Sequence, residues 1–239
     1  MKNYAANNIR NFALVGHGSS GKTMLSESML YKSGEINRLG SIEGGSTVSD
    51  YHHDEHSRQI SIHSSPLHLE WNETKFNLID TPGYLDFIGE TISSLAVVDS
   101  AIIVIHAVNG IEVGTEQVWN YASDFGLPKT LVINGFDREN TKFDTILNQA
   151  KDHFGSNVFP MQLPVNAGPG FNQIVDVLRS ELITYSTDGS GKYKEEDLPD
   201  EWKGQVKELH QELIEYVAES DDSLLEKFFD QGNLSEEEM

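Results

Sequence analysis

The fold of this chain is decided by the stretch Gly16-His17-Gly18-Ser19-Ser20-Gly21-Lys22-Thr23. It follows the apolar residues Phe12–Val15 and precedes residues 24–30, in which apolar side chains recur at helical spacing. A strand, a G-x4-G-K-S/T turn and a helix in this order form the phosphate-binding loop of nucleoside triphosphatases. A Gly/Ser-rich hairpin or a helix cap is the alternative, but it does not explain why lysine and threonine end the turn.

The residue types of this loop suit the binding of phosphate groups. Glycines allow the backbone amides to curl around an anion, and the helix N-terminus directs its unpaired N–H groups toward that anion. We expect Lys22 to reach the β- and γ-phosphates and to stabilise charge on the transferring phosphoryl group, and the Thr23 hydroxyl to ligate Mg²⁺. The predicted nucleotide-binding residues of the loop are Gly16, His17, Gly18, Ser19, Ser20, Gly21, Lys22 and Thr23.

Composition excludes several classes of protein. The 239 residues suffice for one large domain or one domain with an insertion, and the absence of cysteine excludes disulfides and thiolate metal sites. No apolar run approaches the ~20 residues that span a bilayer, and the N-terminus lacks the apolar region of a signal peptide. We therefore expect a soluble cytoplasmic protein without membrane contact.

The formal net charge of −21 opposes general attraction to nucleic acid. We therefore expect no direct sequence-specific nucleic-acid partner, although a local contact with a large ribonucleoprotein stays open.

Residues 12–165 alternate between short apolar strands and helical patterns. Apolar runs such as residues 102–105 are typical of strands buried on both faces, which need helices on both sides of the sheet. This predicts an α/β fold of the P-loop NTPase type with a doubly wound, mostly parallel sheet, and the turn Asn72-Glu73-Thr74 predicts one antiparallel hairpin at its edge. Strands are expected at Phe12–Val15, Ile60–Ile62, Leu67–Trp71, Phe76–Ile79, Ala101–Ile105, Thr130–Ile133 and Val158–Leu163. Helices are expected at Met24–Tyr31, Asp86–Ala96, Thr115–Phe125 and Phe143–His153.

The pattern changes at two places. Residues 32–59 are rich in glycine and serine, and a long loop directly after the first helix is where a nucleotide-sensing loop belongs. After residue 165 the helical pattern dominates, which predicts a core domain at 1–165 and a smaller, mostly helical subdomain at 166–239. Ser235 with Glu238 predicts a further helix start, so we expect this subdomain to be incomplete at its C-terminus and the chain to belong to a longer protein.

A second candidate element of the site is Asp80-Thr81-Pro82-Gly83, directly after a predicted buried strand. In a chain with a phosphate-binding loop, an aspartate at this strand end is placed to hold Mg²⁺ through water. The Gly83 amide can approach the γ-phosphate because no Cβ intervenes. The alternative is a plain turn.

A third element is Asn134-Gly135-Phe136-Asp137, after the predicted strand Thr130–Ile133. A carboxylate at Asp137 can accept two hydrogen bonds from guanine N1 and N2, a pair of donors that adenine lacks. Because an unpaired buried carboxylate is costly, such a pair discriminates strongly between the two bases. Asn134 is expected to tie this segment to the phosphate-binding loop.

Together these motifs resemble those of the translational GTPases, in particular the elongation factor G family. Gly16–Thr23 and Asp80–Phe87 are similar to the family's first and third motifs, and Asn134–Asp137 is similar to its Asn-Lys-x-Asp motif. Residues 58–62 (Arg-Gln-Ile-Ser-Ile) resemble the family's Arg-Gly-Ile-Thr-Ile switch motif, and residues 163–238 resemble the opening of an inserted subdomain. The family's fifth motif, which reads guanine, lies beyond the end of the chain.

The resemblance implies a GTP/GDP switch that uses Mg²⁺, hydrolyses GTP slowly and is stimulated by the ribosome through the full-length protein. It implies that Ser61 ligates Mg²⁺ and that Tyr84 stands where the family's histidine positions the attacking water. A phenol is neutral at pH 7 and a poor general base, so a nucleotide-binding module that docks on the ribosome with little or no hydrolysis is the alternative. Ser19 replaces an aspartate of the family, and Gly135 replaces a lysine whose stem covers the base.

Histidines are dense near the predicted loop, and this suggests a third possibility, a zinc site. A solvated loop, or metal acquired during purification, explains the same pattern. The residues concerned are His52, His53, His56, His63 and His68, with Asp50 and Asp54.

Overall fold

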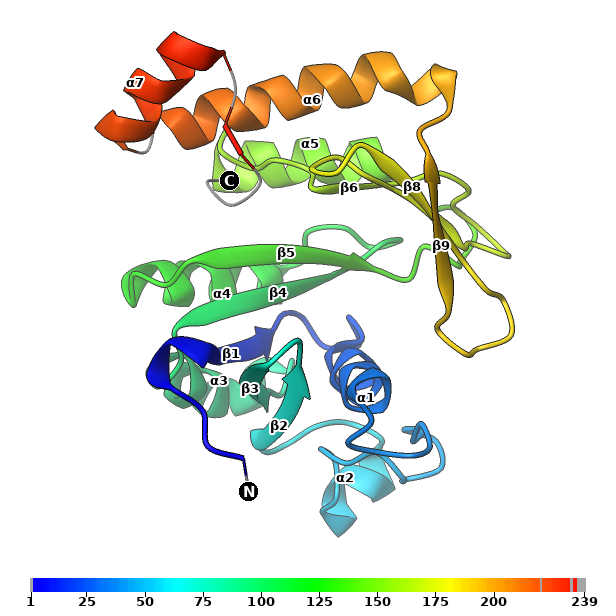
Figure 1. The fold of residues 1–239 in the computed structure, drawn as a ribbon. Helices are drawn as coiled ribbons and strands as arrows, with labels where there is room; N and C mark the ends of the chain where they lie inside the picture. The colour runs from blue at the N-terminus through cyan, green and yellow to red at the C-terminus, as the bar shows by residue number, and fades with distance from the viewer. Residues whose placement is uncertain (1, 220, 233, 236–239) are drawn as a thin grey trace. The chain divides into compact units, whose positions relative to one another are not determined.

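A five-stranded sheet with the order β2-β3-β1-β4-β5 organises the N-terminal part of the chain in the computed structural model (Figure 1). Strand β1 is parallel to β3 and to β4, and β4 is parallel to β5, while β2 runs antiparallel to β3. The predicted parallel sheet with one antiparallel edge hairpin is therefore confirmed. The strands are β1 (Ile9–Val15), β2 (Ser65–Trp71), β3 (Thr74–Asp80), β4 (Ser100–His106) and β5 (Lys129–Asn134).

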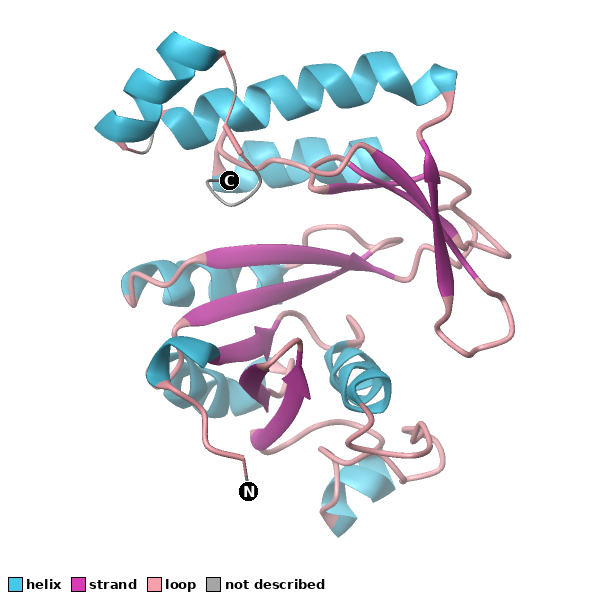
Figure 2. Cartoon of the chain, in the orientation of Figure 1, coloured by secondary structure: helices cyan, strands magenta, loops and turns pink. Residues whose placement is uncertain are grey.

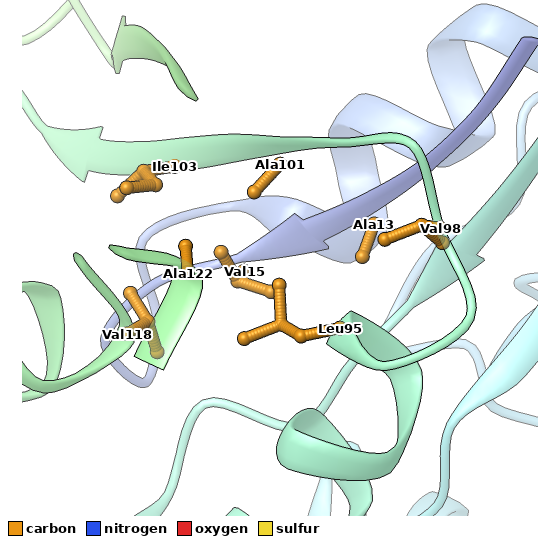
Figure 3. Close-up of a cluster of buried hydrophobic side chains, with 8 residues drawn as sticks. All are labelled: Ala13, Val15, Leu95, Val98, Ala101, Ile103, Val118 and Ala122. Atoms are coloured by element: carbon orange, nitrogen blue, oxygen red, sulfur yellow. The ribbon is translucent and has the colours of Figure 1, made fainter. Parts of the chain in front are cut away.

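Helices cover both faces of this sheet because the buried strands alternate side chains between two apolar surfaces. Ala13 and Val15 of β1 point to one face, where they pack with residues of β4, α3 and α4 (Figure 3). Phe12 and Leu14 point to the other face, where Leu30 of α1 packs. The helices here are η1 (Ala6–Asn8), α1 (Lys22–Ser33), α2 (His53–Arg58), η2 (Leu85–Phe87), α3 (Ile88–Leu95) and α4 (Val113–Asp124).

The chain divides into two compact units, Met1–Gly135 and Phe136–Met239. The described residues of the second unit hold a four-stranded antiparallel sheet of order β6-β7-β8-β9 and the helices α5, α6 and α7 (Figure 2). Its core is made by Leu163, Val175, Val177, Leu182, Leu198 and Val206. Its elements are α5 (Phe143–Phe154), β6 (Gln162–Pro164), β7 (Gln173–Asp176), β8 (Glu181–Tyr185), β9 (Tyr193–Asp197), α6 (Asp200–Ala218) and α7 (Asp222–Gln231).

The structure describes residues 2–219, 221–232 and 234–235, and it differs from the sequence-based expectations in three respects. Ile60–Ile62 is not a strand, and the strand expected at Val158–Leu163 is the short β6, which pairs with β7 instead of joining the parallel sheet. Strands β7, β8 and β9 were not expected in a mostly helical segment. The two compact units divide at Gly135, and the domain boundary expected at residue 165 stays a prediction.

Two further points concern the ends and the surface of the chain. The helix start expected at Ser235–Glu238 lies mostly outside the described residues. Among the helices that the structure describes, none is long and apolar enough to cross a membrane.

Candidate nucleotide-binding site

The loop between β1 and α1 takes the path that its sequence predicts. Helix α1 begins at Lys22, and Gly21 before it has a left-handed backbone with φ of 99°. A Cβ at Gly21 would collide with the side-chain amide of Asn134, so glycine is needed for the close approach of these two segments. Asn134 Nδ2 donates a hydrogen bond to the carbonyl oxygen of Ser20 at 3.0 Å. The end of β5 is thereby tied to the loop.

Lys22 is buried at the start of α1, with 5% of its surface exposed. Its Nζ donates to the carbonyl oxygens of Gly16 at 3.0 Å and His17 at 2.9 Å. Burial lowers the pKa of Lys22 to about 8, and the nearby carboxylates of Asp80 and Asp50 oppose this shift. The ammonium thus lies at the loop that is predicted to hold phosphates, in an environment that favours a strong negative partner.

Asp80, the last residue of β3, is 2% exposed. Burial raises its pKa to about 6, against the opposing effects of Ser49, Lys22 and Thr23 nearby. Its Oδ1 has no hydrogen-bond partner, and its Oδ2 accepts only a long bond, 3.4 Å, from Ser26 Oγ among the hydrogen bonds of the described residues. A buried carboxylate so weakly satisfied is suited to a cation or to water held by a cation.

The hydroxyls expected to ligate Mg²⁺ lie together. Thr23 Oγ1 and Ser61 Oγ are 3.1 Å apart, so the residues around Ser61 reach back to the start of α1. Thr23, Ser61 and Asp80 offer only oxygen atoms, the donors that Mg²⁺ prefers. The donor set of these residues therefore fits a magnesium ion, and the roles of Thr23, Ser61 and Asp80 toward it stay predictions.

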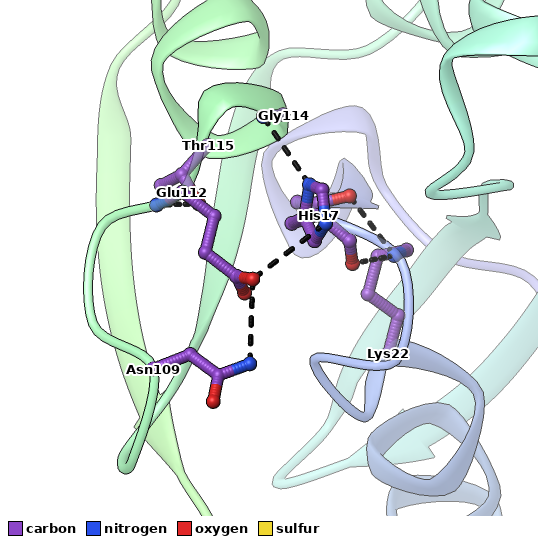
Figure 4. A network of polar contacts seen from close by, with 7 residues as sticks. His17, Lys22, Asn109, Glu112, Gly114 and Thr115 are labelled. Atoms are coloured by element: carbon purple, nitrogen blue, oxygen red, sulfur yellow. Dashed lines mark hydrogen bonds and ion pairs between the residues drawn. The ribbon is translucent and has the colours of Figure 1, made fainter.

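The side chain of His17 contacts residues at the N-terminus of α4, and its part in nucleotide binding stays a prediction. Its Nδ1 accepts a hydrogen bond from Gly114 N at 3.3 Å, and its Nε2 lies 3.6 Å from Glu112 Oε1 (Figure 4). Glu112 also accepts from Asn109 Nδ2 at 3.3 Å. The side chain of His17 therefore anchors the loop to the N-terminus of α4, while its carbonyl holds Lys22.

The turn after Asp80 packs against the phosphate-binding loop. The Thr81 hydroxyl donates to the carbonyl of Leu14 at 2.7 Å, which fixes the turn on β1. A Cβ at Gly83 would lie 2.7 Å from Gly18 N, so Gly83 comes close to the loop amide. The ring of Tyr84 lies over Gly18, since a Cβ there would be 3.3 Å from two ring carbons. Tyr84 is 42% exposed, which leaves its ring partly open to solvent above the loop.

Two buried acidic residues near the loop, Glu27 and Glu55, were missed by the sequence analysis, and a third, Asp50, was named there only as a candidate zinc ligand. Glu27 of α1 accepts from the amides of Gly40 at 2.7 Å and Val48 at 3.0 Å, and so holds two points of the long 32–59 segment. Glu55 of α2 is buried in the same way and is described below. Asp50 lies near Lys22, and burial raises its pKa. Charge and spacing alone do not indicate this burial, because the partners of Glu27 and Glu55 are backbone amides that no sequence pattern marks.

Within the segment predicted to recognise the base, Asn134 has a defined contact with the phosphate-binding loop. Asn134 contacts the phosphate-binding loop, whereas Asp137 is an exposed residue of the second unit, so its contact with guanine stays a prediction. Gly135 has a left-handed backbone with φ of 93°. A lysine at this position, as in the Asn-Lys-x-Asp motif, would be strained here although space is available.

We expect Asp80 to make folding stability dependent on pH. Its folded pKa of about 6 lies above the ordinary 3.8, so the folded protein holds the proton more tightly than the unfolded chain does. Stability contributed by the neutral carboxyl is therefore lost as pH rises from about 4 to 6. Relative to wild type, Asp80→Asn should gain up to about 3 kcal/mol of unfolding free energy between pH 4 and pH 7.

Urea unfolding of the nucleotide-free chain in the presence of a chelator, at several pH values, measures this difference. Asp86→Asn, at an exposed carboxylate of η2, is the matched control and should show no such trend. A pH-independent difference between Asp80→Asn and wild type would contradict the assigned burial of a proton at Asp80.

Comparison with known proteins agrees with this geometry. The sequence model of the elongation factor Tu GTP-binding domain matches residues 7–228. Elongation factor G of Mycoplasma pneumoniae is 35% identical over 228 residues, which are 95% of this chain and 33% of that protein. The crystal structure of a Thermus thermophilus protein matches with a TM-score of 0.87 and 33% identity, over 95% of this chain and 33% of that one.

The chain thus spans about one third of the length of these relatives. The family model covers almost all of the chain, and the solved structure shares the fold over 95% of it. The chain therefore belongs to the translational GTPases, in the family of the elongation factor GTP-binding domain.

Proposed function

We propose that this chain is the GTP/GDP switch domain of an elongation-factor-G-like translation factor that binds Mg²⁺ and hydrolyses GTP slowly. In this proposal the full-length protein works in the cytoplasm and the ribosome stimulates its hydrolysis. The observation that carries the proposal is the convergence of Lys22, Asp80 and Thr23 at one buried edge of the sheet. Family membership supports it.

Five residues of the site would take part in the proposed reaction. Bound Mg²⁺ supplies charge neutralisation for the phosphates. Thr23 and Ser61 would hold the ion, and the ammonium of Lys22 would stabilise charge on the transferring phosphoryl group. The Gly83 amide, close to the loop, can donate to the γ-phosphate, and the Tyr84 hydroxyl can orient a water but is a poor base.

Nucleotide preference tests the proposal directly. The affinities of the full-length protein for GDP and ADP, each with Mg²⁺, are measured by titration calorimetry. We expect GDP to bind at least about 100-fold more tightly, because Asp137 would be left with an unpaired oxygen beside adenine. Failure to bind either nucleotide contradicts the proposed function, and equal affinities contradict the role assigned to Asp137.

A second candidate is a nucleotide-binding module that docks on the ribosome with little or no hydrolysis. The ring of Tyr84 over Gly18 favours it, because a phenol there offers no effective general base. Single-turnover hydrolysis with and without ribosomes separates the two candidates. Ribosome-stimulated release of phosphate supports the switch, and its absence supports the docking module.

Tyr84→His should raise the rate of single-turnover hydrolysis by at least about tenfold, since an imidazole can accept a proton near neutral pH. Tyr84 is half exposed, so the exchange should leave the fold intact. Tyr84→Phe is the matched control, because it keeps the ring over Gly18 and removes only the hydroxyl. A histidine variant no faster than wild type would show that the side chain at this position does not limit the reaction.

A further inference from the structure

The structure brings three of the seven histidine and aspartate residues near the 32–59 loop into one cluster. His52, Asp54 and His63 each offer one ligand atom, and these atoms lie within 4.8 Å of one another. His63 Nε2 is 3.9 Å from Asp54 Oδ2, and the rings of His52 and His63 have centroids 4.6 Å apart. His56 is not part of the cluster, because its Nε2 donates to the carbonyl of Asp50 at 2.7 Å.

The backbones of the two histidines are held by one buried carboxylate. Glu55, 1% exposed, accepts from His52 N at 3.1 Å and from His63 N at 3.0 Å. It accepts from Ile62 N as well, at 3.0 Å. With its oxygens occupied by these amides, Glu55 positions the cluster without being a ligand in it. Asp54 is placed by the first turn of α2, which begins at His53.

The ligand types and spacing suit a transition-metal ion. Two ligands of a tetrahedral zinc ion, each about 2.1 Å from the metal, are themselves about 3.4 Å apart. The three atoms of the cluster need to approach one another by up to about 1.4 Å, which side-chain rotations of half-exposed residues can provide. Imidazole nitrogens prefer zinc and similar ions to Mg²⁺, so this cluster differs in chemistry from the oxygen site at Thr23, Ser61 and Asp80.

We propose that His52, Asp54 and His63 bind a zinc ion, with water completing its coordination, and that the ion clamps the loop on both sides of Ser61. No contact with the nucleotide is assigned to the three residues of the cluster or to Glu55, which supports them. The zinc site is therefore independent of the proposed function. Ser61 lies two residues before His63 and is hydrogen-bonded to Thr23. A clamp at His63 therefore restrains the segment that reaches the predicted magnesium site.

Zinc titration of the 239-residue chain, free of any histidine tag and pre-treated with chelator, tests the site. We expect one equivalent of zinc to bind with a dissociation constant on the order of micromolar or tighter, and Co²⁺ to give the visible absorption of a low-coordinate ion. His63→Ala and Asp54→Asn should each weaken binding at least about tenfold. His63→Ala keeps its backbone amide, so the bond to Glu55 survives. His53→Ala and His68→Ala are the matched controls and should bind as wild type does.

Hydrogen exchange tests the clamp separately. Zinc should slow amide exchange across residues 52–64 by at least about fivefold in the wild-type protein. It should not change the exchange rates of the His63→Ala variant. Zinc binding that the His63→Ala variant retains, or that the His53→Ala control loses equally, would mean adventitious binding and overturn the site. Specific binding without added protection would overturn the clamp. Neither result depends on whether the protein binds GTP.

Discussion

Lys22→Ala is expected to weaken GTP and GDP binding by at least about 100-fold. The ammonium is held at the phosphate-binding loop by the carbonyls of Gly16 and His17, in a site from which water is largely excluded. Hydrogen bonds to charged groups there contribute about 1.5–3 kcal/mol each, and ~2.7 kcal/mol corresponds to a 100-fold change in affinity. Calorimetric titration of the full-length protein with GDP and Mg²⁺ measures the loss.

The variant also removes the nearest positive charge from Asp80, so its fold must be checked by thermal unfolding in the same buffer. Lys32→Ala is the matched control, because Lys32 lies in the last turn of the same helix and is exposed. It should bind nucleotide as wild type does. A folded Lys22→Ala protein with unchanged affinity for GDP would remove the phosphate-binding role of the loop.

The fold and the phosphate-binding loop could be predicted because their information is local. The loop needs fixed spacings of glycine, lysine and threonine, and a strand and a helix flank it on either side. The strand that ends at Asp80 and the one that ends at Asn134 are short apolar runs, each followed by a polar residue at the same edge of the sheet. Parallel strands bring such ends together whatever the rest of the chain does.

The β6-β7-β8-β9 sheet could not be predicted from the periodicity of apolar residues in the sequence. Strand β9 (Tyr193–Asp197) consists of exposed and mostly charged residues, and β6 (Gln162–Pro164) is very short and ends in proline. These strands form because neighbouring backbones pair with them, and apolar alternation is too weak to mark them. Tertiary pairing likewise explains why Ile60–Ile62, apolar in pattern, is not a strand. The carboxylate of Glu55 accepts hydrogen bonds from the amide of Ile62 and from that of the next residue, His63.

The acidic residues around the loop show a second limit of sequence reasoning. Glu27 lies in the helix expected at Met24–Tyr31 and Glu55 in the loop expected at 32–59, yet both are buried and hold backbone amides of the 32–64 segment. A buried carboxylate can accept hydrogen bonds from backbone amides in place of carbonyl oxygens. Each of these bonds compensates part of the hydration that the carboxylate loses on burial. These hydrogen bonds join Glu27 to amides 13 and 21 residues away and Glu55 to amides 3, 7 and 8 residues away, so no single spacing indicates them.

Asp137→Asn is expected to weaken GDP binding by at least about 100-fold and to create affinity for xanthosine diphosphate. A carboxylate accepts from both N1 and N2 of guanine, whereas an asparagine amide presents one acceptor and one donor. That pair complements xanthine, which keeps the N1 donor but has a carbonyl oxygen in place of the amino group. Asp137 is exposed in its unit, so the exchange should not disturb folding.

Titrating the full-length Asp137→Asn protein with GDP and with xanthosine diphosphate, each with Mg²⁺, measures both effects. Glu139→Gln, an exposed carboxylate two residues further along the same segment, is the matched control and should keep the wild-type preference for GDP. Loss of affinity for GDP together with a gain of affinity for xanthosine diphosphate requires that residue 137 contact the C2 substituent of the base. A general weakening of the site does not invert the preference between these two nucleotides. Unchanged affinity for GDP would place base recognition in residues other than Asp137, while leaving the phosphate contacts of Lys22 and the oxygen ligands of the magnesium site as they are.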